Sequence, residues 1–343
     1  MPDALLLSRA DLEKALDFPS VLAVVEEAFE MDRRGEWDTP KRITARTRAG
    51  GMLAMPCAGG SPQALGAKLV STFPGNTALG LPSVSGLYVL FDPNTGVPRS
   101  IMDGAYLTLV RTAAVSALAT RLLARKEART LGLLGAGGQA EFHVRLLAMV
   151  RPIDAVVVWA RRIEQAKALV ANLRAREDLG QITSWRVALE AREAAGCDVV
   201  VTATAATEPV LLGRFLREGG HVNAIGAHTT NSREIDTEAV TRSSILATET
   251  ADTLAEAGDF QLADEEAGNV ITRAVTLGAL LGSSRAEGYS RDPRAVTIFK
   301  SCGVAFEDLA LAAFAFRRSL EMRLGASFAF ARPASHRDST TQL

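Results

Sequence analysis

A glycine-rich turn within residues 130–141, TLGLLGAGGQAE, is the part of the sequence that points most clearly to chemistry. An apolar segment leads into Gly135, Gly137 and Ala140, which stand at the positions of a G-x-G-x-x-G/A pattern before a helix-forming segment. The first glycine permits a tight turn, the second lets backbone N–H groups approach a pyrophosphate, and the small third residue lets helix and strand pack closely. The motif predicts a dinucleotide site, and the alternative is a strand-to-helix turn that binds nothing.

Two arginines after the next apolar segment bear on the type of dinucleotide. Residues 155–159 read as a strand, and Ala160, Arg161 and Arg162 follow it. A site for NAD usually carries an acidic residue there for the ribose 2′-hydroxyl, whereas a site for NADP carries a cation for the 2′-phosphate. The pattern therefore favours NADP(H), with NAD(H) possible. Alternatively, both arginines are a solvated helix start paired with Glu164.

Three cations in the first third of the chain stand in unusual surroundings. Lys68 alternates with Val70 and Thr72, so it can share the inward face of a strand. Arg111 shares a helical face with apolar residues, where a charge is costly unless it meets an anion. Arg42 precedes an apolar residue. Each is a candidate anion ligand, and each could equally be a structural ion pair or a side chain whose charged end reaches water.

The elements that must position these residues fall into two kinds of pattern. Strand-like segments at 155–159, 198–203, 220–225 and 244–247, with helical stretches such as 164–174 between them, predict a doubly wound parallel sheet. The first 120 residues look different. They carry a helix near 19–34 and strand candidates at 41–47, 52–56, 66–73 and 86–91, followed by an alanine-rich helix at about 106–125.

The predicted fold class is therefore α/β, with a Rossmann dinucleotide-binding domain and an α+β domain. Residues 126–304 are assigned to the Rossmann domain, and they end with a return segment at 296–304. Residues 1–125 and 305–330 are assigned to the other domain, onto which a helix at about 307–324 packs back. The polar residues 331–343 are predicted to be a disordered tail.

Composition excludes several classes of function. With 343 residues, 48% hydrophobic and 22% charged content, the chain can bury two domain-sized cores. A net charge of −1 gives no electrostatic case for nucleic acid or for an anionic membrane. Neither a signal peptide nor a membrane span is evident, so we expect a cytoplasmic location. Three scattered cysteines and four histidines suggest no disulfide framework and no metal site.

A series of motifs resembles the ornithine cyclodeaminase/mu-crystallin family along residues 5–325. The resemblance is carried by segments on both sides of the glycine turn. They are residues 68–76, Leu81-Pro82, 92–98, Met102-Asp103-Gly104, Leu107-Thr108, 111–114, 135–140, 223–227, 299–303 and Glu307-Asp308.

The resemblance implies a homodimer that acts on small α-amino or α-imino acids by hydride exchange at Cα. The domain at the two ends of the chain would bind substrate and make the dimer. Positions matching Arg42, Lys68 and Arg111 hold the substrate carboxylate in the family, and Met55 is predicted to bind substrate beside them. The family's cofactor-lining positions match Ser83, Thr112, Gly138, Gln139, Thr204 and Ser301.

Departures from the family pattern bear on the reaction. Ornithine cyclodeaminases carry a carboxylate just before the Met-Pro pair to handle the side-chain amine, and this chain has Leu53 ahead of Met55-Pro56. The same enzymes use an aspartate as acid/base after the strand that ends at 226–227, and this chain has His228. Histidine can do that work near neutral pH. The alternative is a loop histidine bonded to backbone.

These departures predict an NADPH-dependent reductase of a small α-imino acid, such as a cyclic ketimine carboxylate, or an amino-acid dehydrogenase run in reverse. Lys68 and His228 are the predicted catalytic residues, which supply or manage the proton. An ornithine-cyclodeaminase-type or alanine-dehydrogenase-type activity is the alternative enzyme. A cofactor-dependent binding protein with little turnover, as mu-crystallin's hormone binding illustrates for the family, is the alternative outside enzymes.

Overall fold

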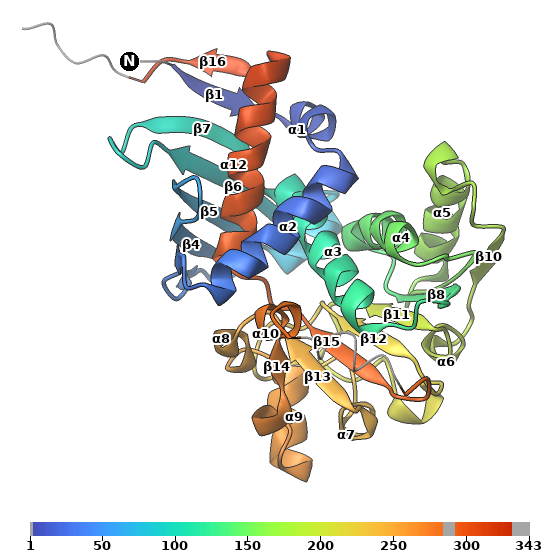
Figure 1. The fold of residues 1–343 in the computed structure, drawn as a ribbon. Coiled ribbons are helices and arrows are strands. Elements are labelled where there is room, and N and C mark those ends of the chain that lie inside the picture. The colour runs from blue at the N-terminus through green and yellow to red at the C-terminus, as the bar shows by residue number, and fades with distance from the viewer. Residues whose placement is uncertain (1–2, 284–291, 331–343) are drawn as a thin grey trace, which may run out of the picture.

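Two eight-stranded sheets form the molecule, which we describe from a computed structural model covering residues 3–283 and 292–330. Figure 1 shows one sheet in the upper left with the long helices α2 and α12 across it, and the other sheet in the lower right. The residues 331–343 predicted to be a disordered tail lie outside the described residues.

The first sheet is mixed and has the order β16-β1-β7-β6-β5-β4-β2, with β3 also paired to β4. All its pairs are antiparallel except β1 with β7. Its strands are β1 (Ala4–Leu7), β2 (Trp37–Asp38), β3 (Ile43–Arg46), β4 (Gly51–Gly59), β5 (Ala64–Thr72), β6 (Val84–Phe91), β7 (Pro98–Asp103) and β16 (Ala326–Phe328). The helices beside it are α1 (Arg9–Ala15), α2 (Phe18–Arg33) and α12 (Ala305–Met322), and the turn η1 is Pro74–Leu79.

The second sheet is parallel throughout and has the order β10-β9-β8-β11-β12-β15-β13-β14. Its strands are β8 (Thr130–Leu134), β9 (Ala155–Trp159), β10 (Ser184–Val187), β11 (Val199–Thr202), β12 (His221–Ala224), β13 (Ile245–Thr248), β14 (Val275–Thr276) and β15 (Thr297–Lys300). The strand order reverses between β8 and β11, which is where such sheets bind a dinucleotide. The predicted α/β class with a Rossmann half is confirmed.

Helices cover this sheet and connect its strands. They are α4 (Gly138–Val150), α5 (Ile163–Arg174), α6 (Ala191–Ala195), α7 (Thr237–Arg242), α8 (Ala251–Leu254), α9 (Gly258–Ala267) and α10 (Leu277–Leu281), with the turns η2 (Glu177–Leu179), η3 (Gly213–Phe215) and η4 (Ile271–Arg273).

Some strands differ from the sequence prediction. The return segment at 296–304 forms β15, which inserts between β12 and β13. The order of strands depends on contacts between distant segments, so the local pattern did not show it. The strand β10, with residues SWRV, was missed because it lies at the sheet's edge and carries exposed polar residues. The predicted alanine-rich helix is α3 (Gly104–Leu123).

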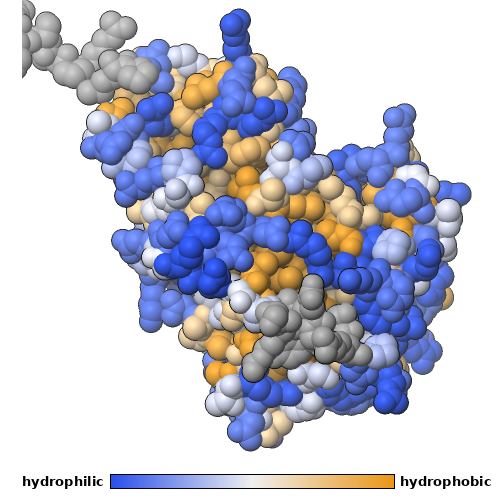
Figure 2. All heavy atoms as spheres, in the orientation of Figure 1, coloured by the Kyte–Doolittle hydropathy of each residue, from blue (hydrophilic) through white to orange (hydrophobic). Residues whose placement is uncertain are grey.

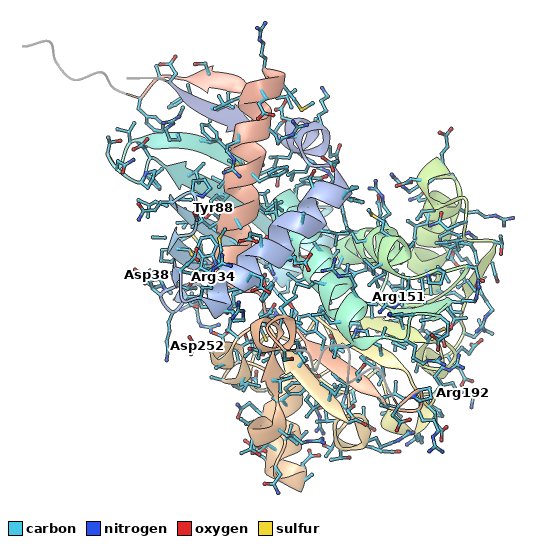
Figure 3. All side chains as sticks on the ribbon, in the orientation of Figure 1. Arg34, Asp38, Tyr88, Arg151, Arg192 and Asp252 are labelled. Carbon is cyan, nitrogen blue, oxygen red and sulfur yellow. The ribbon has the colours of Figure 1, made fainter. Side chains whose placement is uncertain are left out.

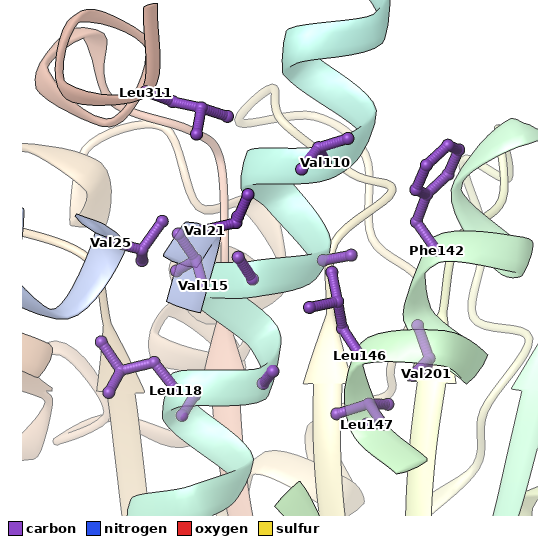
Figure 4. Close-up of a cluster of buried hydrophobic side chains, with 14 of the residues drawn as sticks. Val21, Val25, Val110, Val115, Leu118, Phe142, Leu146, Leu147, Val201 and Leu311 are labelled. Carbon is purple, nitrogen blue, oxygen red and sulfur yellow. The ribbon is translucent and has the colours of Figure 1, made fainter. Parts of the chain in front are cut away.

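The helix α3 lies at the centre of the molecule and joins its two halves. Most of its residues are buried, so the helix is surrounded by the rest of the molecule on all sides. Figure 4 shows Val115 and Leu118 of α3 facing Val21 and Val25 of α2, with Leu146 of α4 on the other side. Its alanines allow neighbouring backbones to approach closely. The last carbonyls of α3 accept hydrogen bonds from the Arg151 guanidinium, which lies close to the helix end (Figure 3).

The outer surface is mostly polar. Figure 2 shows hydrophilic residues over most of one face, with a group of apolar residues in the middle of the view, where the two halves meet. Among the described helices, none is both long enough and apolar enough to cross a membrane.

Candidate active site

The glycine turn lies at the carboxyl end of β8 and opens α4. Gly135 has φ +118°, and a Cβ there would lie 2.4 Å from the carbonyl oxygen of Ala203, so a side chain does not fit. Gly137 is the N-cap of α4 and provides no side-chain cap. A Cβ on Gly137 would meet nothing within 4 Å. The turn therefore presents uncapped N–H groups of a 13-residue helix to open space, which is what a pyrophosphate requires.

Residues behind this turn hold its shape. Ala140 is fully buried, which fits its predicted packing role. His143 is also buried, and its Nδ1 lies 2.8 Å from the carbonyl oxygen of Gln139 while its Nε2 lies 3.0 Å from the Ser116 hydroxyl. Burial lowers the pKa of His143 to about 4, so the ring is neutral and Nδ1 donates to Gln139. The side-chain Oε1 of Gln139 is buried without a hydrogen-bond partner in the described structure.

Arg161 and Arg162 follow β9 and are both exposed. Neither forms an ion pair with any residue that the structure describes. Glu164, the partner considered above, pairs with Lys167 at 2.9 Å. The pairing with Glu164 that we considered as an alternative is therefore absent. Two unpaired guanidinium groups stand where a 2′-phosphate is expected.

Glu234 joins the loops that follow β11 and β12. Its carboxylate is fully buried and accepts bonds from the N–H and the hydroxyl of Thr204, both at 2.7 Å. The other oxygen accepts from the Thr202 hydroxyl at 2.8 Å, from the Gly226 N–H at 2.6 Å and from the Ala227 N–H at 3.3 Å. One carboxylate thus fixes Thr204 and the segment before His228. Buried Lys300 also donates to the carbonyl of Ala227 and pairs with Asp259.

His228 is exposed at the end of this segment. Its Nδ1 lies 3.2 Å from the carbonyl oxygen of Gly226, which is the backbone contact that the non-catalytic alternative predicts. The ring nevertheless lines a cavity of about 680 Å³ together with Arg42 and Leu53. The structure therefore places His228 beside a predicted substrate ligand, and its Nε2 has no hydrogen-bond partner among the described residues.

Lys68 and Arg111 meet two carboxylates at the start of α12. The Lys68 Nζ lies 2.5 Å from the Asp308 carboxylate, and the Arg111 Nη1 lies 2.7 Å from that of Glu307. The Arg111 Nε is 3.3 Å from Asp308. All four side chains are buried. The sequence left open whether Lys68 and Arg111 are anion ligands or members of structural ion pairs, and the structure shows both paired with acids that come from a distant helix.

Burial shifts the protonation of this cluster. It lowers the pKa of Lys68 to about 8, although Asp308 opposes the shift. Burial raises the pKa of Glu307 well above its ordinary value, and the neighbouring carboxylate of Glu249 raises it further. A neutral Glu307 leaves two cations facing Asp308 and Glu249. The Oε1 of Glu307 has no hydrogen-bond partner in the described structure.

Arg42 joins this cluster through the segment that follows β15. Its Nη2 donates to the carbonyl of Gly303 at 2.8 Å and pairs with Glu256 at 2.8 Å. A Cβ on Gly303 would lie 2.6 Å from both Nη1 and Nη2 of Arg111, so the glycine lets that guanidinium approach. Arg42 and Arg111 therefore both contact Gly303, and the Nη2 of Arg111 has no hydrogen bond among the described residues.

Ser301 stands at the same carboxyl edge and is held by Glu249. The Ser301 hydroxyl donates to Glu249 at 2.5 Å, and the N–H groups of Cys302 and Gly303 donate to it at 2.9 and 2.8 Å. The two oxygens of the buried Glu249 carboxylate therefore hold both Ser301, a predicted cofactor ligand, and Gly303, which contacts Arg111.

The remaining predicted residues fall around this centre. Ser83 lines a groove of about 1220 Å³ together with Gly138 and Gln139, so the structure brings these cofactor candidates together. Thr112 is buried on α3 next to Arg111, and its hydroxyl donates to the carbonyl of Thr108 at 2.7 Å. Met55 lies directly opposite Lys68 on β4 and is buried. Tyr88, opposite Lys68 on β6, is buried beside α12 (Figure 3).

Sequence reasoning missed the acidic residues that organise the site. They are Glu234, Glu249, Asp259, Glu307 and Asp308. Glu307 and Asp308 open a helix, where acids are common because they complement the helix dipole, so their type gave no distinct signal. The others follow strands or turns and look like surface residues. The one available signal was the family resemblance, which includes Glu307-Asp308 but gave them no role.

Comparison with known proteins gives a consistent result. The profile of the ornithine cyclodeaminase/mu-crystallin family matches residues 3–322. An alanine dehydrogenase from Archaeoglobus fulgidus is 32% identical, covering 96% of this chain and 99% of its own length. The ketimine reductase mu-crystallin of Mus musculus is 34% identical over 74% of this chain and 78% of its own.

A solved structure agrees with these relatives. The Delta(1)-pyrroline-2-carboxylate reductase of Thermococcus litoralis, in complex with NADH and L-proline, superposes with a TM-score of 0.88. It is 34% identical to this chain, and the superposition covers 94% of this chain and 99% of that one.

Proposed function

Because this chain belongs to the ornithine cyclodeaminase/mu-crystallin family, we propose that it is an NADPH-preferring reductase of a small α-imino acid. The relatives agree with the predicted family and with the predicted activity, that of an NAD(P)-dependent oxidoreductase acting on imino or amino acids. The observation that carries the proposal is the grouping of three cationic side chains at one edge of the parallel sheet. Arg111 and Arg42 both contact Gly303, and Lys68 shares the Asp308 carboxylate with Arg111, next to the carboxyl edge that carries the glycine turn.

A nicotinamide dinucleotide is the cofactor, and the residues present fit it. Gly135 and Gly137 leave the backbone of the turn open, and the N-terminus of α4 has no side-chain cap. The preference for NADPH is supported by the two unpaired arginines after β9. When bound, this cofactor supplies a hydride to the imine carbon. Thr204 and Ser301, held by buried carboxylates, would line it at the sheet edge.

The arginines would hold the substrate's α-carboxylate. In Arg111, Nε and Nη1 are bound to buried carboxylates, so the guanidinium has a fixed orientation, while Nη2 remains without a partner in the described structure. Arg42 approaches the same glycine from the other side. A carboxylate between them would accept charge-assisted hydrogen bonds without either side chain losing much conformational freedom.

Lys68 and His228 are the proton donors that we propose. A lysine whose pKa is about 8 is mostly protonated at neutral pH and still acidic enough to share its proton with an imine or amine nitrogen. Asp308 keeps that ammonium in place. His228 lies on the solvent side of the same region, where it could pass protons between the site and water.

The side-chain pocket argues against cyclodeamination. That reaction needs a group to hold a side-chain ammonium, and Leu53 at the expected position is apolar and lines the cavity with Arg42 and His228. Reversible deamination of an amino acid is the second candidate, because a 32% identical relative over nearly the full chain is an alanine dehydrogenase. It would use the same residues in the opposite direction.

The assembly and location that we propose follow the relatives. A related archaeal alanine dehydrogenase, 30% identical with a TM-score of 0.87, is a dimer. We propose a homodimer for this chain as well, and a cytoplasmic location.

Oxidation of NADPH and NADH, measured with a panel of substrates, tests this function. The panel contains pyrroline-2-carboxylate, piperideine-2-carboxylate, and pyruvate with ammonia or methylamine. We expect NADPH to be consumed with at least one of them, and more efficiently than NADH. Absence of turnover with every imino and keto acid, in a protein that binds NADPH, would favour the binding-protein alternative.

A further inference from the structure

We propose that the substrate carries a second carboxylate at the end of its side chain, and that Arg46 binds it. This inference rests on the proposed reductase function and names its substrate class, an α-imino dicarboxylate. It concerns the cavity of about 680 Å³ that is lined by Arg42, Leu53 and His228.

The strand register places Arg46 on the substrate face of the first sheet. Thr44 lies directly opposite Leu53, and Arg46 directly opposite Gly51. Leu53 in turn lies opposite Val70, two residues from Lys68 on β5. Directly opposed residues in an antiparallel pair point to the same face, and so do residues two apart along a strand. Arg46 therefore shares a face with Leu53 and Lys68.

Space for an anion exists next to Arg46. The residue opposite it is Gly51, which has no side chain, and the residue beyond Gly51 on β5 is Thr72. Arg46, Gly51 and Thr72 all line the cavity of about 680 Å³ that also contains His228. The Arg46 guanidinium can thus lie over the sheet within this cavity, beside a hydroxyl group.

The charges around this cavity are unbalanced. Arg42, Arg46 and Arg48 line it, and Glu256 is the one acidic residue among the lining residues. Glu256 is already paired with Arg42 at 2.8 Å. Neither Arg46 nor Arg48 forms an ion pair within residues 3–283 and 292–330. A cavity with one neutralised and two unpaired cations attracts an anion with more than one charge.

The spacing fits a short dicarboxylate. Residues 42 and 46 are four positions apart, which is about 13 Å along an extended strand. Both side chains are long, and if they turned toward a ligand between them they would shorten this gap to about the length of a chain of four or five carbons. Leu53, between them, would contact the apolar carbons of that chain. An apolar middle with a cation at each end matches a dicarboxylate better than an alkyl or ammonium side chain.

The reaction with such a substrate balances. The keto group of a 2-oxo diacid condenses with ammonia and releases water to form the C=N bond. A hydride from NADPH then adds to the carbon while a proton adds to the nitrogen, so the keto acid, ammonium, NADPH and one proton give the amino acid, NADP⁺ and water. Arg46 takes no part in the bond changes and acts on binding alone.

Matched pairs of acids test the proposal. With ammonia and NADPH, 2-oxoglutarate is compared with 2-oxopentanoate, and oxaloacetate with 2-oxobutyrate. We expect at least a 10-fold higher kcat/KM for the diacid of each pair. Arg46→Gln should lower that ratio 10-fold or more, mainly through KM, and Arg46→Lys should restore part of it. Arg174→Gln, on an exposed arginine of α5, is the control and should leave the ratio unchanged.

A binding measurement separates this inference from the proposed function. Titration of the NADPH-bound protein with glutarate and with pentanoate, followed by NADPH fluorescence, should show at least 10-fold tighter binding of glutarate, lost in Arg46→Gln. Such binding without any turnover would support the second-carboxylate site and contradict the reductase. Turnover with equal or better efficiency for the monoacids, or a ratio insensitive to Arg46→Gln, would overturn the inference and leave the reductase intact. A shift of the dimer equilibrium in Arg46→Gln without change in either ratio would also overturn it.

Discussion

Replacing Asp308 with asparagine tests the charge assignment of the buried cluster. The variant keeps the shape of the side chain and removes the one carboxylate that contacts both Lys68, at 2.5 Å, and Arg111, at 3.3 Å. Removal of one partner from a buried ion pair typically costs about 3–5 kcal/mol, because a charge is left uncompensated away from water. The two cations respond differently to this loss.

Lys68 can release its proton, which limits its share of the cost. With a pKa of about 8, neutralising Lys68 at pH 7 costs about 1.4 kcal/mol, the value of one pKa unit. Arg111 cannot deprotonate and keeps Glu307 and Glu249 as its nearby acids. We therefore expect Asp308→Asn to lower the free energy of unfolding by about 3 kcal/mol at pH 7, the lower end of that range.

The cost should also depend on pH in a defined direction. Because Lys68 is already neutral in the folded parent protein above pH 8, its pairing with Asp308 contributes less there. The destabilisation by Asp308→Asn should therefore be smaller at pH 9 than at pH 7. Equilibrium urea unfolding at the two pH values measures it.

Glu307→Gln is the matched control. Burial raises its carboxyl pKa well above the ordinary value and favours the protonated form, so the substitution removes less negative charge than Asp308→Asn does. We expect a loss below about 1 kcal/mol, the size of one neutral hydrogen bond. A carboxyl group whose pKa is raised in the folded state stabilises the fold at low pH, and this contribution is lost as the pH rises. Above the ordinary glutamate pKa, the free energy of unfolding of the variant should therefore increase relative to that of the parent. Equal losses in Glu307→Gln and Asp308→Asn would refute this assignment of charge.

Three further predictions concern the cofactor, the acid/base and acid stability. Arg161→Ala should reduce the preference for NADPH over NADH by about 1–3 kcal/mol, measured as a ratio of kcat/KM values, and an unchanged ratio would place the 2′-phosphate elsewhere. His228→Asn should slow the chemical step by about 10²–10⁴, and an unchanged rate and pH profile would leave the proton to Lys68. Burial lowers the pKa of His143 to about 4 and of His221 to about 3. Below pH 6.5 the unfolded chain therefore binds more protons than the folded protein does. Each histidine should lower the free energy of unfolding by up to about 1.4 kcal/mol per pH unit on acidification toward pH 4. A free energy of unfolding that stays constant between pH 6.5 and 5 would contradict the neutrality of the two buried rings.

Local features of the sequence predicted the glycine turn and most strands of the parallel sheet. Gly135 and Gly137 belong to a pattern that can be recognised within six residues, and the positive φ of Gly135 is a local requirement, although its close approach is to the distant Ala203. Apolar runs such as Ala155–Trp159 are buried on both faces, so their composition alone identified them. The family resemblance then gave the candidate substrate and cofactor residues, whose roles stay predictions.

Contacts between distant segments could not be predicted in this way. Lys68 and Asp308 are 240 residues apart, and nothing in either segment specifies the other as partner. The same holds for Glu234, whose carboxylate gathers two loops only after β11 and β12 have paired. The insertion of β15 between β12 and β13 likewise depends on the completed sheet.

Transfer of a labelled hydride tests the central claim most directly. Reduction of the best imino acid substrate with NADPH that carries deuterium at both hydrogen positions of nicotinamide C4, followed by mass spectrometry and NMR of the product, reports where the hydride goes. The proposed reductase predicts an α-amino acid with one deuterium on Cα. Oxidation of the labelled cofactor with no deuterium on Cα, or no amino acid product, would contradict the account.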